Sequence, residues 1–339
     1  MNEPAPDSPK LASGLPDPSW EAAFAELSLR SRVQWNASLQ RLNTWRIGGQ
    51  ARCLVDVAEP EDLAKLLPFI AEYQVPWTLL GKGSNLLIPD ETWPGIVIHL
   101  SGSFKHWVPS VEARTVQAGA ALADVTFSQR CVELGWGGME FLVGVPGTIG
   151  GAVAMNAGAH GGEVSDFLSQ ARWFDMRGQE HVASSEQAGF RYRHSHLNGR
   201  NGVVVTSATF ELRESEPAQV RERLSQCLRF REDKQPRQPS CGSVFKNPPG
   251  DHAARLIEHS GLKGFCVGDA QVSLKHANFI VNLGSARSAD LEAVIREVQR
   301  RVFEQHGVSL EPEVQWLQPL PSETLPLLDE PETMSPKWV

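Results

Sequence analysis

The pattern of apolar and polar positions after residue 58 changes from a helical to an extended spacing. Apolar residues recur every three or four positions after Pro60, at Leu63, Leu66, Leu67 and Ile70. This spacing predicts a helix that begins at the proline. The β-rich run WTLL at 77–80 is followed by the loop GKGSN at 81–85 and the run LLIPD at 86–90. The sequence therefore predicts a helix and then a strand–loop–strand unit.

Short extended runs continue on both sides of a glycine-rich stretch. Four of them predict strands: IVIHL at 96–100, TVQAG at 115–119, WFDMRGQ at 173–179 and VVVTSATFEL at 203–212. The helical run ALADVTFSQRCVELG lies between the second and the third. Together these runs predict a mixed α and β domain that ends near residue 213.

A second segment, from about 218 to 317, has a different pattern. It opens with a helical stretch that becomes basic at Arg229, Arg231, Lys234 and Arg237. It closes with a helix whose N-cap we predict to be Ser288 and whose end we place at Gly307. The inward positions of that helix are Leu291, Val294, Ile295, Val298 and Val302, and the strand-like run VSLEPEVQWL follows.

The two ends of the chain differ from its middle. Residues 1–35 form an N-terminal extension that begins Pro- and acid-rich, and its Trp20, Phe24 and Leu27 predict a peripheral helix outside any core. Residues 319–339 alternate proline with acidic side chains, a composition that packs poorly and predicts a disordered tail. Neither end carries recognisable chemistry.

Length and charge narrow the classes of function. A chain of 339 residues exceeds one hydrophobic core, so two or three domains are expected. Its 32 basic and 40 acidic residues give a net charge of -8, which argues against a protein that binds nucleic acid by neutralising phosphates. Any anionic ligand must then be met by basic groups gathered locally.

The cysteines, histidines and N-terminus predict a reduced, metal-free protein of the cytoplasm. Five cysteines without a CxxC pair fit neither a disulfide framework nor a zinc site, and buried thiols are the expectation. His194 and His196 lack the HExxH setting of a metal centre. The N-terminus has no apolar signal-peptide core, and the uncharged stretch 141–162 contains Pro146 and repeated glycine, which suits no membrane helix.

The loop made of Gly81, Lys82, Gly83, Ser84 and Asn85 follows a predicted strand. Its small residues allow consecutive backbone N–H groups to converge on a phosphate. It matches neither the P-loop nor the dinucleotide fingerprint, because Leu86 stands where the latter has its third glycine. A phosphate loop and a plain turn between strands both remain open.

The glycine-rich stretch GVPGTIGGAVAMNAGAHGG covers residues 144–162. Its lack of side-chain bulk suits backbone that lies flat against a large planar ligand, with Thr148 and Asn156 adding hydrogen bonds. Close helix packing or a chain of turns is the alternative.

Three further segments carry polar groups with two interpretations each. Arg193, next to Tyr192, is either part of a surface cluster or a cation that holds developing negative charge. Ser243 is either a general acid or a turn-capping hydroxyl. Glu311 and Glu313 flank Pro312, and spacing does not decide which of them is positioned for chemistry.

Seven motifs, taken in order, resemble those of the UDP-N-acetylenolpyruvoylglucosamine reductase family. They are NTWRIGG (43–49), GKGSNLL (81–87), GVPGTIGGAVAMNAGAHGGE (144–163), FRYRHS (190–195), CGSVFKNP (241–248), VSLKHANFIVN (272–282) and LEPEV (310–314). The resemblance spans about residues 36–318. It implies an α+β fold, in which a two-lobed FAD-binding domain of the vanillyl-alcohol-oxidase (PCMH) type is joined to a smaller α+β substrate-binding domain.

The resemblance also sets the expected domain limits and chemistry. The FAD-binding domain would cover 36–213, with lobes of about 36–100 and 101–213, and the substrate-binding domain 218–318. NADPH would reduce non-covalent FAD and leave, and the enolpyruvyl ether of UDP-N-acetylglucosamine would then enter the same cleft. It would be reduced to UDP-N-acetylmuramate for peptidoglycan, with hydride from flavin N5, charge stabilisation by Arg193 and Glu313, and a proton from Ser243. The enzyme is expected to be a monomer that needs no nucleic acid, membrane or protein partner.

Motif positions imply the ligand contacts. FAD contacts are expected from Gly81, Lys82, Gly83, Ser84, Asn85, Leu86, Gly144, Pro146, Gly147, Thr148, Gly150, Gly151, Ala152, Asn156 and Gly158. Substrate contacts are expected from Tyr192, Lys234, Lys246, Asn247 and His276.

The chain departs from the family in two places. Cys241 stands where many relatives have alanine, and we expect a packing residue, with a reactive thiol as the alternative. Tyr73 and Tyr192 are the only tyrosines, so the lid tyrosine of some relatives has no candidate and the shorter subtype is favoured.

Two other functions remain open. Another FAD oxidase or dehydrogenase of the same superfamily would act on an alcohol or sugar, but gives no reason for CGSVFKNP together with LEPEV. A non-catalytic flavin or nucleotide-sugar binding protein would leave Arg193, Ser243 and Glu313 without a role.

Overall fold

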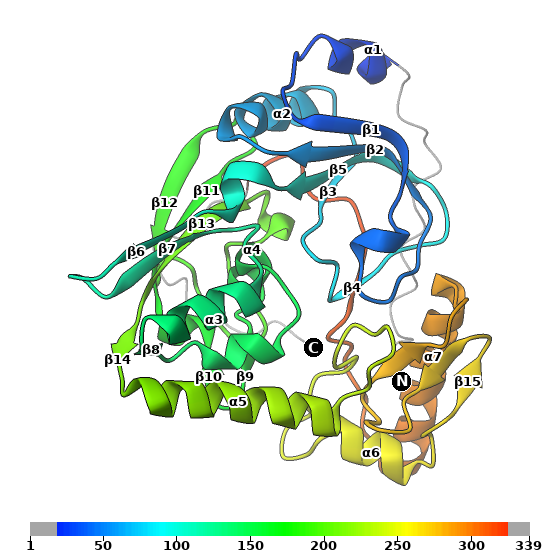
Figure 1. The fold of residues 1–339 in the computed structure, drawn as a ribbon. Coiled ribbons are helices and arrows are strands. Elements are labelled where there is room, and N and C mark those ends of the chain that lie inside the picture. Colours follow the sequence, from blue (N-terminus) through cyan, green and yellow to red (C-terminus); the bar gives the residue numbers. More distant parts are fainter. Residues whose placement is uncertain (1–18, 325–339) are drawn as a thin grey trace, which may run out of the picture.

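A four-stranded sheet forms the first lobe of the molecule (Figure 1). The structure is a computed structural model that describes residues 19–324. The strands, in spatial order, are β1 (Arg32–Ser38), β2 (Gln50–Val57), β5 (Trp93–Leu100) and β3 (Trp77–Leu79). β1 pairs with β2 antiparallel, whereas β2 and β3 both pair with β5 in parallel. Helices α1 (Ser19–Ala25) and α2 (Pro60–Glu72) lie against this sheet, and the 3-10 helix η1 (Gln40–Leu42) follows β1.

Successive residues of the central strands enter two different cores. Val55 of β2 and Ile98 of β5 lie in the main core with α2, while Leu54 and Val97 lie in a smaller core on the opposite face. A strand with parallel partners is usually buried on both faces, and its sequence is then a continuous apolar run rather than an alternating one. The burial of β5 on both faces therefore accounts for the run IVIHL.

A five-stranded antiparallel sheet forms the second lobe. Its strands, in spatial order, are β12 (Glu180–Ser184), β11 (Leu168–Phe174), β13 (Val204–Glu211), β7 (Thr115–Gly119) and β6 (Trp107–Ser110). The lobe also contains the helices α3 (Asp124–Glu133), α4 (Ile149–Ala154), η2 (Gly102–Lys105), η3 (Glu140–Gly144), η4 (Val164–Asp166) and η5 (Gly199–Asn201). Two short ribbons complete it: β8 (Trp136–Gly137) with β14 (Arg213–Glu214), and β9 (Gly158–Ala159) with β10 (Gly162–Glu163).

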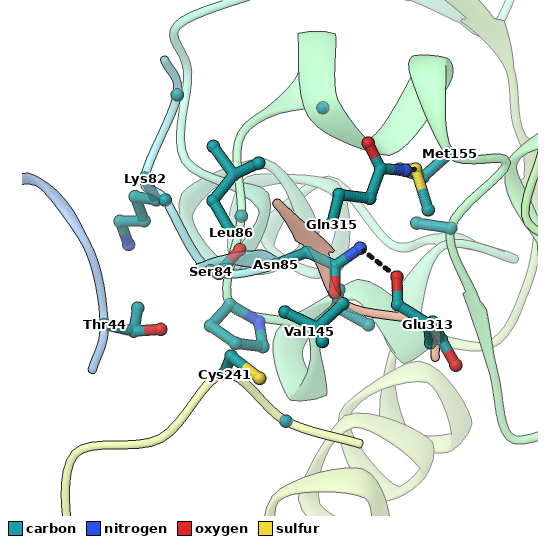
Figure 2. Close-up of a pocket in the computed structure, with 18 of the residues that line it drawn as sticks. Thr44, Lys82, Ser84, Asn85, Leu86, Val145, Met155, Cys241, Glu313 and Gln315 are labelled. Atoms are coloured by element: carbon teal, nitrogen blue, oxygen red, sulfur yellow. Dashed lines mark hydrogen bonds between the residues drawn. The ribbon is translucent and has the colours of Figure 1, made fainter. Parts of the chain in front are cut away.

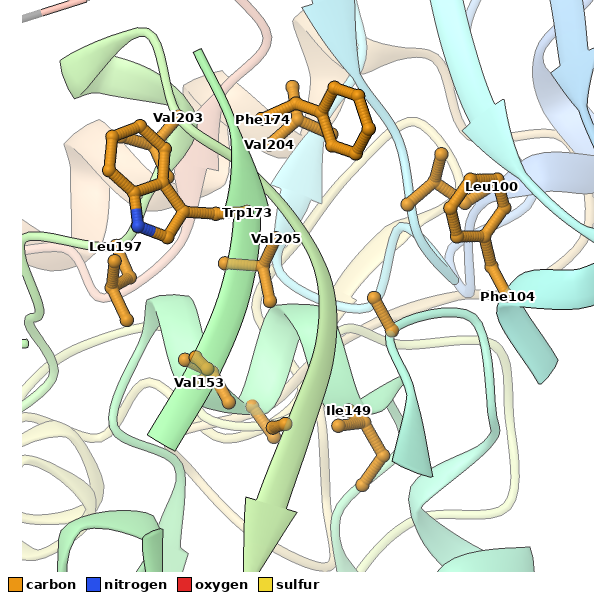
Figure 3. Packing of buried hydrophobic residues seen from close by; sticks show 14 of the residues in the cluster. Leu100, Phe104, Ile149, Val153, Trp173, Phe174, Leu197, Val203, Val204 and Val205 are labelled. Carbon is orange, nitrogen blue, oxygen red and sulfur yellow. The ribbon is translucent and has the colours of Figure 1, made fainter. Parts of the chain in front are cut away.

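The main core joins the two lobes. Figure 3 shows the part of it where Ile149 and Val153 of α4 face Val205 on β13. The apolar stretch 141–162 is thus divided among η3, α4 and the ribbon of β9 and β10. Within residues 19–324, no helix is long and apolar enough to cross a bilayer.

The C-terminal domain packs a three-stranded sheet against two helices. The sheet consists of β15 (Cys266–Val267), β16 (Ala270–Val272) and β17 (Ile280–Asn282), and the helices are α6 (Ala253–His259) and α7 (Ser288–His306). The core of this domain includes Trp45, Ile47 and Leu87 from the first lobe. After α7 the chain returns to the first lobe, where β18 (Gln315–Trp316) pairs in parallel with β4 (Leu86–Leu87).

Helix α1 belongs to the main core, so the prediction of a peripheral helix is wrong. Trp20 and Phe24 are buried, and the Phe24 ring contacts Phe69 of α2 edge to face, with 5.7 Å between centroids. The helical spacing of these residues marks the apolar face of a packed helix. The expected boundary at residue 36 also falls inside a continuous strand, because β1 begins at Arg32.

Helix α5 (Pro217–Lys234) packs against the second lobe, although the sequence placed it at the start of the substrate-binding domain. Its neighbours are α3, η3 and β8. Figure 1 shows α5 running from below α3 towards the C-terminal domain. The chain therefore enters the C-terminal domain after Lys234 and not at residue 218.

The C-terminal tail is ordered at its start. The Leu320 N–H donates to the Trp77 carbonyl at 2.9 Å, and the Thr324 hydroxyl donates to the Gly202 carbonyl at 2.9 Å. Residues 319–324 thus lie against both lobes, and the predicted disorder is wrong for them. The rest of the predicted tail, 325–339, lies outside the described residues, as do residues 1–18 of the N-terminal extension.

Asp90 supplies the N-terminal partner of α7, a role that the sequence assigned to Ser288. Ser288 is the first helical residue, and its hydroxyl donates to the Ile88 carbonyl. The Asp90 carboxylate accepts hydrogen bonds from the N–H groups of Ser288 at 3.0 Å and Ala289 at 3.3 Å. A side chain of the first lobe therefore satisfies amides that the helix leaves free. Gly307 ends the helix with φ of 68°, as predicted.

Candidate active site

A cavity of about 2610 Å³ lies where the two lobes meet the C-terminal domain. Its walls come from 41–46 and 78–86 in the first lobe, from parts of 120–160 and 192–205 in the second, and from parts of 228–247 and 311–317. Pockets for one drug-sized molecule usually measure about 300–1,000 Å³. The cavity therefore has room for a dinucleotide together with a second substrate.

The loop 81–85 forms one wall, and its backbone leaves no space for larger residues. Gly83 has φ of 57°, and a Cβ there would lie 2.4 Å from the Leu42 carbonyl oxygen. A Cβ on Gly81 would lie 3.0 Å from the Thr148 hydroxyl of the facing segment. Figure 2 shows Lys82, Ser84 and Asn85 projecting from this loop into the pocket. The geometry suits backbone N–H groups and a cation gathered around an anion.

The glycine-rich segment forms the facing wall and the start of α4. A Cβ on Gly147 would lie 2.3 Å from the Asp124 carboxylate, and one on Gly150 would lie 2.9 Å from Ala120 Cβ. Thr148 occupies the N-cap position of α4, and its hydroxyl faces Gly81. Each expected FAD residue in this segment lines the cavity except Asn156. The small residues form a flat wall that brings backbone directly to a bound ligand.

Asn156 does not line the cavity. It is fully buried, its side-chain N–H donates to the Arg191 carbonyl at 3.2 Å, and its side-chain oxygen accepts from the Ser165 N–H at 3.0 Å. These two bonds hold the buried amide inside the protein, away from the cavity wall. Asn156 instead supports the turn that carries Arg193.

Arg193 and Glu313 form a partly buried ion pair. Arg193 Nε donates to Glu313 Oε1 at 2.7 Å, and Arg193 Nη2 donates to the Gly158 carbonyl at 3.0 Å. Arg193 has φ of 56° in a tight turn closed by reciprocal backbone hydrogen bonds between Arg191 and His194. A non-glycine residue in this region is strained and is found where the surrounding structure holds it for a purpose. The guanidinium is thus held by two hydrogen bonds on a constrained backbone turn.

Backbone pairing brings Ser243 next to this ion pair. The Val244 carbonyl accepts from the Glu313 N–H at 2.8 Å, and the Lys246 N–H donates to the Glu311 carbonyl at 2.9 Å. The two segments run antiparallel around a bridge between Phe245 and Pro312. Ser243 lies on the cavity wall. The structure therefore gathers Arg193, Ser243 and Glu313 from three distant parts of the sequence.

The structure distinguishes Glu313 from Glu311. The Glu313 side chain is 17% exposed and faces Arg193, whereas that of Glu311 is 69% exposed and pairs with Lys246 Nζ at 2.5 Å. Exposed pairs contribute little, and water screens them. Glu313 is therefore the buried member of the two and faces Arg193, whereas Glu311 lies at the surface with Lys246.

The other expected substrate residues differ in their surroundings. Tyr192 lines the cavity and is 53% exposed, with the Arg193 guanidinium 4.8 Å from its ring centroid. Asn247 accepts the first N–H of α6, from Ala253, at 3.1 Å. His276 lines the cavity, and burial lowers its pKa, so it is neutral at pH 7. Lys234 is exposed at the end of α5 and does not line the cavity.

Basic side chains outnumber acidic ones on the cavity wall, the reverse of the whole chain. The lining contains the basic residues Arg41, Arg46, Lys82, Lys105, Arg193, Arg200, Arg231, Arg237, Lys246 and Arg296. Its acidic residues are Asp124, Glu232, Glu292, Glu311 and Glu313. The predicted local gathering of positive charge is confirmed, and it suits an anionic ligand.

Sequence reasoning missed several of these residues. Arg41 and Lys105 belong to none of the motifs, and Arg46 lies inside NTWRIGG without having been assigned a role. Arg231 Nη1 donates to the Gly144 carbonyl at 2.9 Å and so braces the glycine-rich wall. Arg231 belongs to the basic stretch that the sequence had indicated, whereas Arg41, Arg46 and Lys105 come to one surface only on folding, so no local pattern identified them.

The cysteines near the site are packing residues. Cys241 is buried among apolar residues of the C-terminal core, and burial raises the pKa of its thiol well above the usual value, with a smaller contribution from Glu313. A thiol that does not ionise is a poor nucleophile. Its burial and raised pKa favour a packing role for Cys241 over a reactive thiol. Residues 19–324 contain no group of three or more His, Cys, Asp or Glu side chains arranged to hold a metal ion.

Two family models match the chain. A model described as the C-terminal domain of UDP-N-acetylenolpyruvoylglucosamine reductase matches residues 235–317, and one described as an FAD-binding domain matches residues 51–184. The start of the first match agrees with the end of α5 at Lys234.

Individual relatives extend the similarity over most of the chain. The UDP-N-acetylenolpyruvoylglucosamine reductase of Azorhizobium caulinodans is 39% identical over 317 residues, which cover 93% of this chain and 98% of the relative. That of a Synechococcus species is 43% identical, covering 86% and 94%. The crystal structure of the Thermus caldophilus enzyme of the same name has a TM-score of 0.72 and 38% identity, covering 85% of this chain and 99% of that one.

Proposed function

The chain belongs to the UDP-N-acetylenolpyruvoylglucosamine reductase family, and on that premise we propose that it uses NADPH and bound FAD to reduce UDP-N-acetylglucosamine enolpyruvate to UDP-N-acetylmuramate. The product is a precursor of peptidoglycan. The observation that carries the proposal is the Arg193–Glu313 pair, which lies beside Ser243 in a cavity lined by both glycine segments.

The residues of the cavity fit FAD. The facing segments around Gly81 and Gly147 leave no room for a side chain, which is the surface that a flavin and its diphosphate require. Lys82 lies on the loop that would bind the diphosphate. The Thr148 hydroxyl, on the opposite wall of the cavity, faces Gly81 of the same loop. FAD, when bound, supplies the exchange of hydride between NADPH and the double bond of the substrate.

Arg193 would stabilise the negative charge that develops on the substrate during reduction. Its hydrogen bonds to Glu313 and Gly158 use Nε and Nη2, so Nη1 can donate to the carboxylate of the enolpyruvyl group. Glu313 fixes the plane of the guanidinium before the substrate arrives. One such preorganised donor contributes roughly a hundredfold to a thousandfold in rate.

Ser243 would give its hydroxyl proton to the substrate carbon that carries the developing charge. Serine is a weak acid, but an enolate-like carbon is strongly basic, so the transfer is downhill once hydride has arrived. The backbone pairing of 244–246 with 311–313 keeps Ser243, the residue before Val244, in the same cavity as the charge-stabilising pair.

A comparison of Ser243→Ala with Ser240→Ala tests this assignment. Both serines line the cavity, three positions apart. In both variants NADPH should bleach the flavin absorbance at a normal rate. The enolpyruvyl substrate should reoxidise the flavin at least about a hundredfold more slowly in Ser243→Ala, the usual effect of losing a general acid, and normally in Ser240→Ala. Normal turnover of Ser243→Ala would show that another group supplies the proton.

The choice of substrate is tested with the wild-type protein. We expect the NADPH-reduced flavin to be reoxidised by UDP-N-acetylglucosamine enolpyruvate and not by simple alcohols or sugars that react with other FAD enzymes. A flavin that NADPH does not reduce, or that this substrate does not reoxidise, would contradict the proposed activity.

A further inference from the structure

Asp124 is a buried carboxyl group for which the described protein provides no partner. It is 1% exposed, and neither Oδ1 nor Oδ2 makes a hydrogen bond. It nevertheless lines the large cavity. An unpaired buried polar group is costly, and native proteins keep few of them. The partner of this carboxyl group is therefore expected to be a bound ligand.

The carboxyl group lies where the two glycine segments meet. The Asp124 N–H donates to the Gly147 carbonyl at 3.2 Å, and Oδ2 lies 2.3 Å from the point that a Cβ on Gly147 would occupy. The Ser84 hydroxyl lies 4.0 Å from the same point. Asp124 thus lies at the corner between loop 81–85 and segment 144–151, the two parts of the chain that we expect to hold FAD.

A structural role in α3 does not account for the residue. Asp124 is the first residue of α3, where an ionised carboxylate would favour the helix dipole. Its oxygens, however, accept none of the free amides of the first turn. Against the larger effect of burial, the positive charge of Lys82 lowers the pKa of Asp124. The two side chains nevertheless form no salt bridge among the described residues 19–324. Neither a helix cap nor a salt bridge is present.

The surroundings favour the neutral acid. Burial raises the pKa of Asp124 well above its usual value, and the attraction of Lys82 offsets this only in part. A neutral carboxyl group has one O–H donor, whereas a carboxylate has none. Next to a diphosphate, whose oxygens only accept, a carboxylate would repel the ligand and a neutral acid would bind it.

We propose that Asp124 is a cofactor-binding residue that donates a hydrogen bond, as a neutral acid, to an oxygen of the FAD diphosphate. The inference rests on the proposed function, because it takes FAD as the ligand of the cavity. It adds an acidic residue to a site whose expected contacts are glycines, hydroxyls and a cation.

The affinity of the apoprotein for FAD tests the role of the side chain. FAD is titrated into the protein, and binding is followed by quenching of flavin fluorescence. Asp124→Asn keeps a neutral donor, and its dissociation constant should stay within about threefold of the wild type. Asp124→Ala leaves a phosphate oxygen unpaired and should bind FAD about 10- to 100-fold more weakly. Glu133→Gln, which changes an exposed carboxylate on the same helix, should bind normally.

The stability of the FAD-free protein separates ligand binding from packing. An unpaired acid held for a ligand destabilises the empty protein, so Asp124→Asn should unfold at the same or a higher temperature than the wild type when FAD is absent. If the side chain served packing, Asp124→Ala would instead lower the melting temperature of the FAD-free protein. The increase in melting temperature that FAD causes should be smaller in Asp124→Ala than in the wild type.

The pH dependence of binding provides a second test. The negative charge of the diphosphate raises the pKa of Asp124. At a pH where Asp124 is ionised in the FAD-free protein, FAD binding is therefore accompanied by uptake of one proton. Wild-type affinity should therefore fall as pH rises through the pKa of the empty protein, and that fall should be absent in Asp124→Asn. Lys82, the other charge at this corner, remains in both proteins.

Two results would overturn the inference. If Asp124→Ala binds FAD as tightly as the wild type, the carboxyl group does not contact the cofactor. If Asp124→Asn loses tenfold or more in affinity, an ionised carboxylate accepts a hydrogen bond instead. Failure of the proposed function is a distinct outcome, since the wild type would then bind no FAD, or its bound FAD would not pass electrons from NADPH to the enolpyruvyl substrate.

Discussion

The side chain of Asn85 donates a hydrogen bond to the backbone carbonyl of Glu313 at 3.0 Å, across 228 positions of sequence. Figure 2 shows this bond between the loop that faces the expected diphosphate and the segment that carries the charged pair. The Asn85 carbonyl in turn accepts from the Gln315 N–H at 3.0 Å. One residue of loop 81–85 thus sets the position of the segment that carries Glu313.

Asn85→Ala should therefore destabilise the protein through both segments. Loss of one partly buried hydrogen bond costs about 1 kcal/mol of the free energy of unfolding, measured by urea denaturation without FAD. Ser84→Ala provides the control, because the Ser84 hydroxyl makes no hydrogen bond to residues 311–317 in the described chain. Equal midpoints for Asn85→Ala and the wild type would mean that the bond contributes nothing.

Glu313→Gln and Glu311→Gln compare two carboxyl groups two positions apart. Glu313→Gln keeps an acceptor for Arg193 but removes the charge that orients the guanidinium. We expect reoxidation of the flavin by substrate to slow about a hundredfold, while reduction by NADPH keeps its rate. Glu311→Gln changes an exposed residue and should stay within about twofold. Similar losses in both variants, in stopped-flow measurements, would contradict the distinction.

The thiols should differ sharply in reactivity. Burial raises the pKa of Cys53 to about 12 and that of Cys241 well above its usual value, whereas Cys266 is exposed. Ellman's reagent at pH 8 should therefore label one thiol in the native protein and all five in denaturant. Cys266→Ser should remove the fast reaction. A fast reaction lost in Cys241→Ser would mean that the site opens to solvent.

Asp90→Ala should weaken the junction between the first lobe and α7. It removes the acceptor for two helix amides, a change that costs about 1 kcal/mol for a typical N-cap. The loss is measured as a lower midpoint of chemical unfolding. Glu91→Ala, which changes the exposed neighbour, should leave the midpoint unchanged. Equal effects from the two variants would exclude capping as the cause.

The last turns of α7 should show a small pH-dependent stabilisation. Hydrogen bonds from Arg300 and Arg301 lower the pKa of Glu297 to about 2. A lowered folded-state pKa means that the unfolded chain binds more protons, so the contribution is present above about pH 4 and lost as pH falls towards 2. Because the side chains are largely in water, Glu297→Gln should cost no more than about 0.5 kcal/mol at pH 7. The cost should shrink as pH falls below 4, disappear below about pH 2, and weaken in high salt.

Periodicity in the sequence predicted the local elements well. The run TVQAG matches β7 from Thr115 to Gly119, and the spacing after Pro60 matches α2. Both signals depend on neighbours within a few positions, which is the range that periodicity reports. The sequence also showed that Trp20 and Phe24 share a helical face, but not that Phe69 and the first sheet would cover it.

Partners that are distant in sequence account for what could not be predicted. The N-cap rule chose Ser288 because it looks only at adjacent residues, whereas the amides of α7 are bonded by Asp90, 198 positions away. The sequence spacing did not distinguish Glu311 from Glu313. The structure does, because Arg193, which is distant in sequence, pairs with Glu313. Nothing next to Asp124 in the sequence indicates that its carboxyl group is buried without a partner.

Trp45 makes the folding of the first lobe depend on the C-terminal domain. Its indole N–H donates to the Ile280 carbonyl at 2.7 Å, its own carbonyl accepts from Asn282, and it packs with Ile47 and Leu87 in the C-terminal core. On the ribosome Trp45 emerges more than two hundred residues before its partner Ile280. The nascent chain must therefore expose the Trp45 side chain to chaperones or to aggregation until the C-terminal domain has been synthesised. For the same reason, residues 235–317 are not a module that can be exchanged among relatives without the strand and loop residues that complete their core.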